Sequence, residues 1–305
     1  MKISEYSEKQ LVDLLKRGHL LLSLKPFVTR VQSDIVSIAR DIALMYGDFE
    51  TCPIDSFADF HVSVVQETGI LGWMKPRARF YFDGRPSFVP LPVDQAFAML
   101  EWGLNWCIAA HSHQYLVIHA AVVEREGRAA ILPGAPGAGK STLCAALITR
   151  GWRLLSDELA LFDMETSVLY GTCRPVNLKN TSIDIIKQFA PQVVMTESVA
   201  DTTKGTIALM RPPTGSVSMV ESPAHPAWVV LPRYLPSAPP KLESHSRAET
   251  FMLIAEQSFN YDIHGANGFN AVGNLIDRSQ CYEFTYSKLE DAVSVFDGLC
   301  LGRIG

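Results

Sequence analysis

The segment from Gly134 to Thr142 constrains the fold of this 305-residue chain more than any other part of it. It matches the pattern GxxxxGK[ST] and continues by one residue, with Gly134, Ala135, Pro136, Gly137, Ala138, Gly139, Lys140, Ser141 and Thr142. In this pattern, glycines allow consecutive backbone N–H groups to face phosphate oxygens, the lysine reaches the β and γ phosphates, and the hydroxyl binds Mg²⁺. The segment therefore predicts a site for a nucleoside triphosphate, in which these nine residues bind the cofactor.

The elements expected on either side of this loop have the order that such a site needs. Residues 117–123 and 128–132 are strand-like apolar runs, separated by the turn 124–127. Residues 142–150 have helical apolar spacing, and Gly151 is a residue type that commonly ends helices. A helix that begins at the loop adds the positive end of its dipole to the phosphate site.

Composition excludes several classes of protein. The chain has 27 basic and 32 acidic residues, a net charge of −5, and predicts neither a nucleic-acid surface nor a membrane-binding basic patch. Its six cysteines form no CxxC pair and no Cys/His cluster, which favours a reducing compartment over a zinc module. The N-terminus lacks the apolar core of a signal peptide, so we expect a cytoplasmic protein without nucleic-acid or membrane partners.

Helical and strand-like segments alternate along the chain, which predicts an α/β fold. Residues 1–115 are expected to form an N-terminal α+β module that binds a partner or substrate, and residues 116–305 the nucleotide-binding domain. Within the module, residues 94–111 are predicted as a helix with Trp102 and Trp106 four positions apart. The pair could form a ligand platform, but helical spacing favours core packing.

Asp157 and Glu158 lie seventeen and eighteen residues after Lys140, between the strand-like runs 152–156 and 159–162. Carboxylates near a phosphate-binding lysine can bind Mg²⁺ directly or through water, and one can accept the proton of an attacking hydroxyl. The alternative is a solvated acidic turn.

His119 lies twenty-one residues before Lys140, in the apolar run that precedes the loop. A histidine in such a run is, taken alone, more often a core residue than a catalyst.

Together these segments resemble the catalytic core of HPr kinase/phosphorylase. The resemblance covers roughly residues 117–163 and rests on Ile118-His119, Gly127, the phosphate loop and the run from Arg150 to Glu158. It implies a phosphoenolpyruvate-carboxykinase-like fold with a mixed sheet, His119 beside the transferred phosphate, and Asp157 as general base toward a serine. Glu158 would replace the second aspartate of the family, and Ala120 and Thr142 also differ from its pattern.

A second resemblance extends along most of the chain. Residues 100–107, 119–124, 151–158 and 174–180 are similar to the HPr-kinase-related kinase A family, whose relatives include lasso-peptide kinases. This resemblance implies a serine of a peptide or small protein as acceptor and a PqqD-like protein as partner. The HPr kinase resemblance also suggests assembly into a homo-oligomer.

Basic and polar residues beyond the carboxylates are candidates for binding phosphate or peptide, because the transferred charge must be neutralised from more than one side. These residues are Arg174, Lys179, Asn180, Lys204 and Arg211. The alternative is that they belong to exposed loops. Likewise, residues 260–261 and 267–270 either line an acceptor groove or form turns.

The sequence thus predicts an ATP- and Mg²⁺-dependent serine kinase. Its catalytic residues would be His119, Lys140, Asp157 and Glu158, and its metal ligands Ser141, Asp157 and Glu158. Two alternatives remain open, namely an ATP-binding regulatory or switch protein that holds a partner and a kinase acting on a small molecule.

Overall fold

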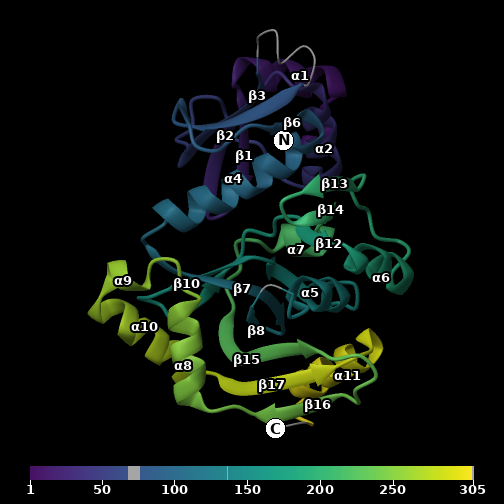
Figure 1. Cartoon of the computed structure of the whole chain (residues 1–305). Helices are drawn as coiled ribbons and strands as arrows, with labels where there is room; N and C mark the ends of the chain where they lie inside the picture. Colours follow the sequence, from purple (N-terminus) through teal and green to yellow (C-terminus); the bar gives the residue numbers. More distant parts are fainter. Residues whose placement is uncertain (68–75, 136, 304–305) are drawn as a thin grey trace.

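The structure, a computed structural model, describes residues 1–67, 76–135 and 137–303, and it confirms the predicted α/β class. Three β-sheets and the helices that pack on them make up the fold (Figure 1). In Figure 1 the first sheet lies in the upper part, the C-terminus lies at the bottom, and helix α4 (Ala96–His111) lies between the first sheet and the rest.

The first sheet belongs to the N-terminal module. Its strands are β1 (Leu20–Leu24), β2 (Phe27–Ser33), β3 (Phe60–Gln66), β4 (Arg77–Phe82), β5 (Arg85–Pro86) and β6 (Leu91–Pro92). They pair in the order β1-β2-β3-β4-β5, and β6 also pairs with β4. One apolar core is shared by this sheet, by α4 and by two further helices, α1 (Glu8–Arg17) and α2 (Val36–Tyr46). Two short 3-10 helices complete the module, at Ile3–Glu5 and Val93–Gln95.

The second sheet is mixed, as the resemblance described above implies. Its strands are β7 (Tyr115–Arg125), β8 (Arg128–Pro133), β9 (Arg153–Ser156), β10 (Leu159–Asp163), β11 (Leu169–Tyr170), β15 (His225–Tyr234), β16 (Lys241–Ser244) and β17 (Gln280–Tyr286). Their order is β11-β10-β7-β8-β15-β17-β16, with β9 also on β7. Strand β15 is parallel to both β8 and β17, whereas β7 is antiparallel to β8, β9 and β10.

A small third sheet and seven further helices complete the described chain. The third sheet contains β12 (Val176–Lys179), β14 (Gly205–Met210) and β13 (Val199–Thr202), in that order. The helices are α5 (Lys140–Ile148), α6 (Thr181–Phe189), α7 (Thr214–Ser218), α8 (Arg247–Glu256), α9 (Tyr261–His264), α10 (Ala266–Asp277) and α11 (Leu289–Cys300).

Helices cover both faces of the second sheet, because successive strand residues point to opposite faces. Ala121 and Val123 of β7 belong to the core that contains α5 and α11. Ala120 and Val122 belong to the core that contains α8 and α10. The apolar residues of the run 117–123 are therefore all buried, whichever face of the sheet they point to, and only His119 in this run is half-buried.

The hairpin between β7 and β8 sets the register of the second sheet. Its two turn residues, Glu126 and Gly127, have φ values of 55° and 78°, the signature of a type I′ turn. This turn places Pro133, the last residue of β8, opposite Ala120.

The other edge of β7 is paired with β9 and then with β10. Ser156 lies opposite Val122 and Leu159 lies opposite His119. Asp157 and Glu158 therefore lie between β9 and β10, on one edge of β7. The phosphate loop begins on the opposite edge of β7, at about the same position along that strand.

The predicted boundary at residue 115 coincides with the first residue of β7. The two sides of this boundary nevertheless share a core, since the cluster around the first sheet includes Val117, Leu161 and Leu209. An ion pair between Arg211 and Asp48, with an N–O distance of 2.8 Å, also crosses the boundary.

Core packing of the two tryptophans is not observed. Trp106 is 37% exposed, with its ring edge-on to Phe82 and Phe88. Trp102 is half-buried, and the Nζ atom of Lys204 lies 5.1 Å from the centroid of its ring.

Of the two segments expected to line a groove or form turns, Asn260 lies in a turn that leads into α9, whereas the other is helical. Residues 267–270 lie inside α10, because the following residues Ala271 and Val272 are buried against the sheet. Asn260 is buried, and its side-chain amide bonds to the backbone of β7 by accepting from the Val117 N–H (3.0 Å) and donating to the Tyr115 carbonyl (2.8 Å).

No helix of the described residues is both long enough and apolar enough to cross a membrane.

A close approach between α4 and β4 generates a stability prediction. A Cβ atom added at Gly103 would lie 2.1 Å from a ring carbon of Phe80. We expect Gly103→Ala to lower the free energy of unfolding by about 1–3 kcal/mol, because overpacking forces side chains or helix to move. The measurement is urea unfolding followed by circular dichroism.

The matched control is Gly273→Ala, also inside a helix. A Cβ atom there meets no heavy atom within 4 Å, so the better helix propensity of alanine should leave stability unchanged or raised by up to about 1 kcal/mol. Equal effects of both substitutions would contradict the prediction.

Candidate functional site

The phosphate loop leaves the end of β8 and leads directly into α5. Gly134, Gly137 and Gly139 have φ values of 142°, 88° and 95°, in the region that side-chain-bearing residues rarely adopt. At Gly139 an added Cβ would also lie 2.6 Å from the hydroxyl of Tyr286. The glycines predicted for backbone freedom thus occupy positions that require it. Pro136 of the predicted loop lies outside the described residues.

Lys140 is the first residue of α5, where free backbone N–H groups and the helix dipole favour an anion. Its side chain is buried, and its Nζ atom donates to the carbonyls of Gly134 and, at 3.3 Å, of Ala135. Burial lowers the pKa of Lys140, and the charge of Asp157 counteracts this effect. A phosphate at this helix end would offer the ammonium group a charged acceptor in place of the two carbonyls.

Asp157 is buried beside the loop, with 5% of its surface exposed. Its Oδ2 atom accepts the backbone N–H of Asn177 at 3.0 Å. Its Oδ1 atom is buried and has no hydrogen-bond partner among the described residues. The neighbouring Ser141 hydroxyl favours the charged carboxylate and so lowers its pKa. Burial and the negative charge of Glu158 together raise the pKa of Asp157 to about 7.

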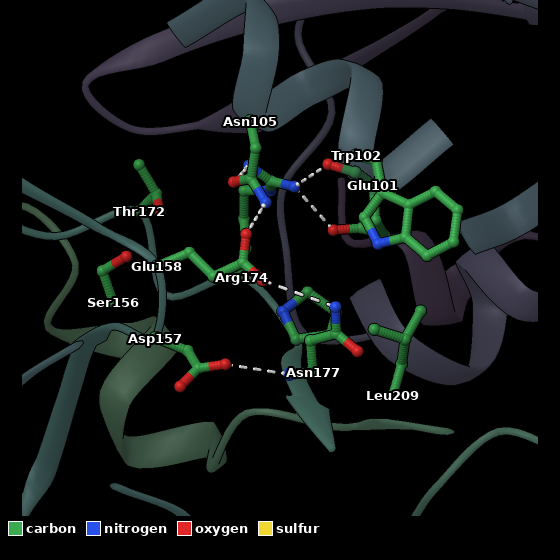
Figure 2. Close-up of a pocket in the computed structure, with 11 residues that line it drawn as sticks. Glu101, Trp102, Asn105, Ser156, Asp157, Glu158, Thr172, Arg174, Asn177 and Leu209 are labelled. Atoms are coloured by element: carbon green, nitrogen blue, oxygen red, sulfur yellow. Dashed lines mark hydrogen bonds and ion pairs between the residues drawn. The ribbon is translucent and has the colours of Figure 1, made fainter. Parts of the chain in front are cut away.

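Glu158 is half-buried and is bound by two side-chain amides (Figure 2). Its Oε2 atom accepts from Asn105 at 2.7 Å, and its Oε1 atom accepts from Asn177 at 3.4 Å. The alternative of a solvated acidic turn is therefore wrong for this pair, because both carboxylates are in contact with neighbouring elements.

His119 lies on β7 opposite Leu159 and next to the carboxylates. Its ring is half-buried, lies 5.9 Å from the ring centroid of Phe259 and lines the same cavity as the phosphate loop. It is therefore not a core histidine. Burial, and then the charge of Lys140, lower the pKa of His119, so that the imidazole is neutral at pH 7.

One cavity of about 1060 Å³ brings these groups together. A ligand pocket typically measures about 300–1,000 Å³, so this cavity is large enough for a sizeable ligand. Its polar lining includes the loop, the carboxylates and His119. Its apolar lining comes from α6, α11 and the ends of β15 and β17, with Ile185, Phe189, Leu289, Tyr234 and Tyr286.

The five predicted substrate residues divide into two groups. Lys179, Asn180 and Lys204 line the cavity, whereas Arg174 and Arg211 are not among the described residues that line it.

Both arginines are bound to carboxylates that are remote in sequence. Arg174 is buried and donates to the Glu101 carboxylate and to the Asn105 side-chain oxygen, both at 2.7 Å (Figure 2). Arg211 donates to Asp48 at 2.8 Å. Neither is positioned to bind a phosphate or peptide, which corrects the prediction for these two residues.

Sequence reasoning missed Asn105 and Asn177 as site residues. Asn177 carries a recognisable signal, because a polar residue between Val176 and Leu178 in a buried strand needs a hydrogen-bond partner. Asn105 carries no such signal in the sequence, since its hydrogen-bond partners lie more than fifty residues away along the chain.

The donor set fits Mg²⁺ in type and number. Ser141, Asp157 and Glu158 supply one hydroxyl and two carboxylates on one cavity, and Asp157 has an unpartnered buried oxygen. Among the described residues no group of three or more His, Cys, Asp and Glu side chains is placed to hold a metal ion. An ion here would share its coordination with phosphate oxygens and water, as Mg²⁺ usually does.

Comparison of the chain with protein-family models and with curated proteins finds no match. The function therefore has to follow from the cavity and its residues.

The raised pKa of Asp157 predicts how stability depends on pH. The pKa is about 7 in the folded protein and 3.8 for an unperturbed aspartate. The proton therefore stabilises the fold, fully below pH 3.8 and progressively less as the pH rises through 7. We expect Asp157→Asn to be more stable than the wild type by roughly 2–4 kcal/mol at pH 8, with a smaller difference at pH 5.

Urea unfolding in buffer with a metal chelator, at half-unit steps from pH 5 to 8, measures this difference. The exposed Asp55 provides the control, and Asp55→Asn should show no such trend. A variant at Asp157 that is less stable than the wild type at pH 8 would refute the assignment of a destabilising buried charge.

Proposed function

We propose that this protein is an ATP- and Mg²⁺-dependent kinase of the HPr-kinase type, which transfers the γ-phosphoryl group to a serine hydroxyl of a peptide or small protein. One observation carries the proposal. The buried carboxylate of Asp157 lines the same cavity as the phosphate loop, on the opposite edge of β7. A nucleotide on the loop would thus have its terminal phosphate near a candidate base.

Asp157 is suited to accept the proton of the attacking hydroxyl. The Asn177 N–H fixes Oδ2, while Oδ1 is free of hydrogen bonds within the described residues. A pKa of about 7 matches a general base that works near neutral pH. In the transfer, the serine oxygen bonds to the γ-phosphorus, the bond from that phosphorus to the β–γ bridging oxygen breaks, and the serine proton moves to Asp157.

The remaining groups of the cavity stabilise charge on the transferred phosphate. Lys140 and the first N–H groups of α5 face it from the loop side. The neutral imidazole of His119 donates one N–H, and Lys179 and Lys204 add positive charge from β12 and from the turn between β13 and β14. When bound, Mg²⁺ would be held by Ser141, Asp157 and Glu158, directly or through water, and would neutralise the β and γ phosphates.

The resemblance to the kinase A family supports a peptide or protein acceptor over a small molecule. It also makes a PqqD-like protein the proposed partner, and cytoplasmic action and homo-oligomeric assembly belong to the same proposal. The contact between Asn105 of α4 and Glu158 favours one other function, a nucleotide-dependent switch that signals to the N-terminal module.

Transfer of label from γ-³²P-ATP tests the proposal. The wild type with Mg²⁺ should label a serine of a peptide or of a protein encoded by a neighbouring gene. We expect Asp157→Asn to lower the transfer rate by about 10²–10⁴-fold, because it removes the base, while ATP binding is retained. Lys140→Ala should weaken ATP binding itself, and Asp55→Asn should change neither.

The fate of the label separates the alternatives. Undiminished transfer by Asp157→Asn contradicts the assigned base, and a dialysable labelled product identifies a small-molecule kinase. Label that remains on ATP, or is released only as inorganic phosphate, with tight nucleotide binding identifies a switch. Mass spectrometry places the phosphate on its acceptor residue.

A further inference from the structure

Helix α4 of the N-terminal module contributes a side chain to the proposed catalytic site. The Nδ2 atom of Asn105 donates to Glu158 Oε2 at 2.7 Å, across 53 residues of sequence. The Oδ1 atom of the same side chain accepts from Arg174 at 2.7 Å. A guanidinium only donates and a carboxylate only accepts, so these two partners determine the orientation of the amide.

The hydrogen bonds continue from Arg174 into the core of the module. Arg174 donates to both the carboxylate and the backbone carbonyl of Glu101, at 2.7 Å each (Figure 2). Tyr46 of α2 donates to the other carboxylate oxygen of Glu101 at 2.5 Å. The side chains of Arg174 and Glu101 are only 7% and 4% exposed. Few alternative partners exist at such depth, so the buried pair restrains the position of Asn105.

Glu158 depends on amide donors for its orientation. It lies next to Asp157 in sequence and on the same cavity as Lys140 and Lys204, so without those donors its carboxylate could turn toward an ammonium group. Asn105 and Asn177 each occupy one carboxylate oxygen. Each oxygen retains a lone pair for a ligand, and the carboxylate plane is fixed.

A second side chain of α4 contacts a residue that lines the same cavity. The ring of Trp102, one turn before Asn105, lies 5.1 Å from the Nζ atom of Lys204, within the range of a cation–π interaction. Helix α4 thus orders one acidic and one basic residue of the cavity.

From these contacts we propose that Asn105 is a positioning residue, which fixes the Glu158 carboxylate for phosphoryl transfer, so that the N-terminal module completes the active site. The activity part of this proposal rests on the proposed kinase function. The structural part does not rest on that function, because it concerns only the orientation of the Glu158 oxygen atoms toward a divalent cation that binds together with a nucleotide.

Two substitutions at Asn105 test the proposal. Asn105→Leu keeps the side-chain shape and removes both hydrogen bonds. Asn105→Asp keeps the acceptor for Arg174 but places a carboxylate against Glu158. We expect both to lower kcat by about 10–100-fold, the usual effect of losing a group that orients a ligand, with little change in the KM for ATP.

The control breaks a different contact between the two parts of the chain. Asp48→Asn removes the charge that pairs with Arg211, which is not among the described residues lining the cavity. It should leave kcat within about twofold of the wild type, because neither residue of this pair is among the described residues that line the cavity. A loss by Asp48→Asn equal to that of the Asn105 variants would overturn the proposal in favour of a general packing effect.

Cation binding supplies a readout that does not need catalysis. Isothermal titration of Mn²⁺ into protein saturated with a non-hydrolysable ATP analogue should show about 10–100-fold weaker binding for Asn105→Leu. Thermal unfolding of each variant establishes that the protein tested is folded. Wild-type Mn²⁺ affinity in Asn105→Leu, or no Mn²⁺ binding by the wild type, would overturn the positioning role. If the wild type binds Mn²⁺ and Asn105→Leu weakens this binding, but the wild type transfers no phosphate, only the kinase function would be refuted.

Discussion

The pairing register of β7 is the constraint on which the rest of the site depends. The type I′ turn at Glu126 and Gly127 aligns β7 with β8, so that the phosphate loop begins beside Ala120. On the opposite edge, the break between β9 and β10 falls at the same level. Because strand side chains alternate between faces, a slip of one residue would exchange the residues of the two cores and separate the loop from the carboxylates. A local turn therefore determines the distance between the phosphate loop and the two carboxylates, which are about twenty residues apart in the sequence.

Burial then gives each group of the site its chemical character. Removal from water raises the pKa of Asp157 and lowers the pKa of His119 and Lys140, and the charges of neighbouring groups modify each shift. The same low-polarity environment makes an unpaired polar group costly. Asn177 accordingly bonds to both carboxylates, through its backbone N–H and its side-chain amide. Asp157 Oδ1 and Asn177 Oδ1 nevertheless have no hydrogen-bond partner among the described residues.

Local sequence patterns predicted the parts of the site that depend on neighbouring residues. The phosphate loop needs glycines at fixed spacing, and the carboxylates follow directly after a strand, so both were recognisable without tertiary information. The sequence assigns Arg174 and Arg211 wrongly, because local sequence does not indicate the partner of a basic residue in a loop. Arg174 pairs with Glu101, 73 residues away, and Arg211 with Asp48, 163 residues away. Residues 267–270 have the composition of a turn, but burial of the apolar residues that follow favours the helix. Asn105 could not be predicted, because its role exists only once α4 lies against the second sheet.

The core shared across residue 115 has a consequence for how this protein can be divided. Val117, Leu161 and Leu209 pack against the N-terminal module, and in a fragment beginning at residue 116 their side chains would face water. Each would forgo about 1.5–3 kcal/mol of hydrophobic stabilisation, against a total stability of about 5–15 kcal/mol for a typical protein. The part of the chain from residue 116 onward is therefore not a portable unit that gene fusion could transfer to other chains, even though the motifs of the candidate site all lie on one side of that residue.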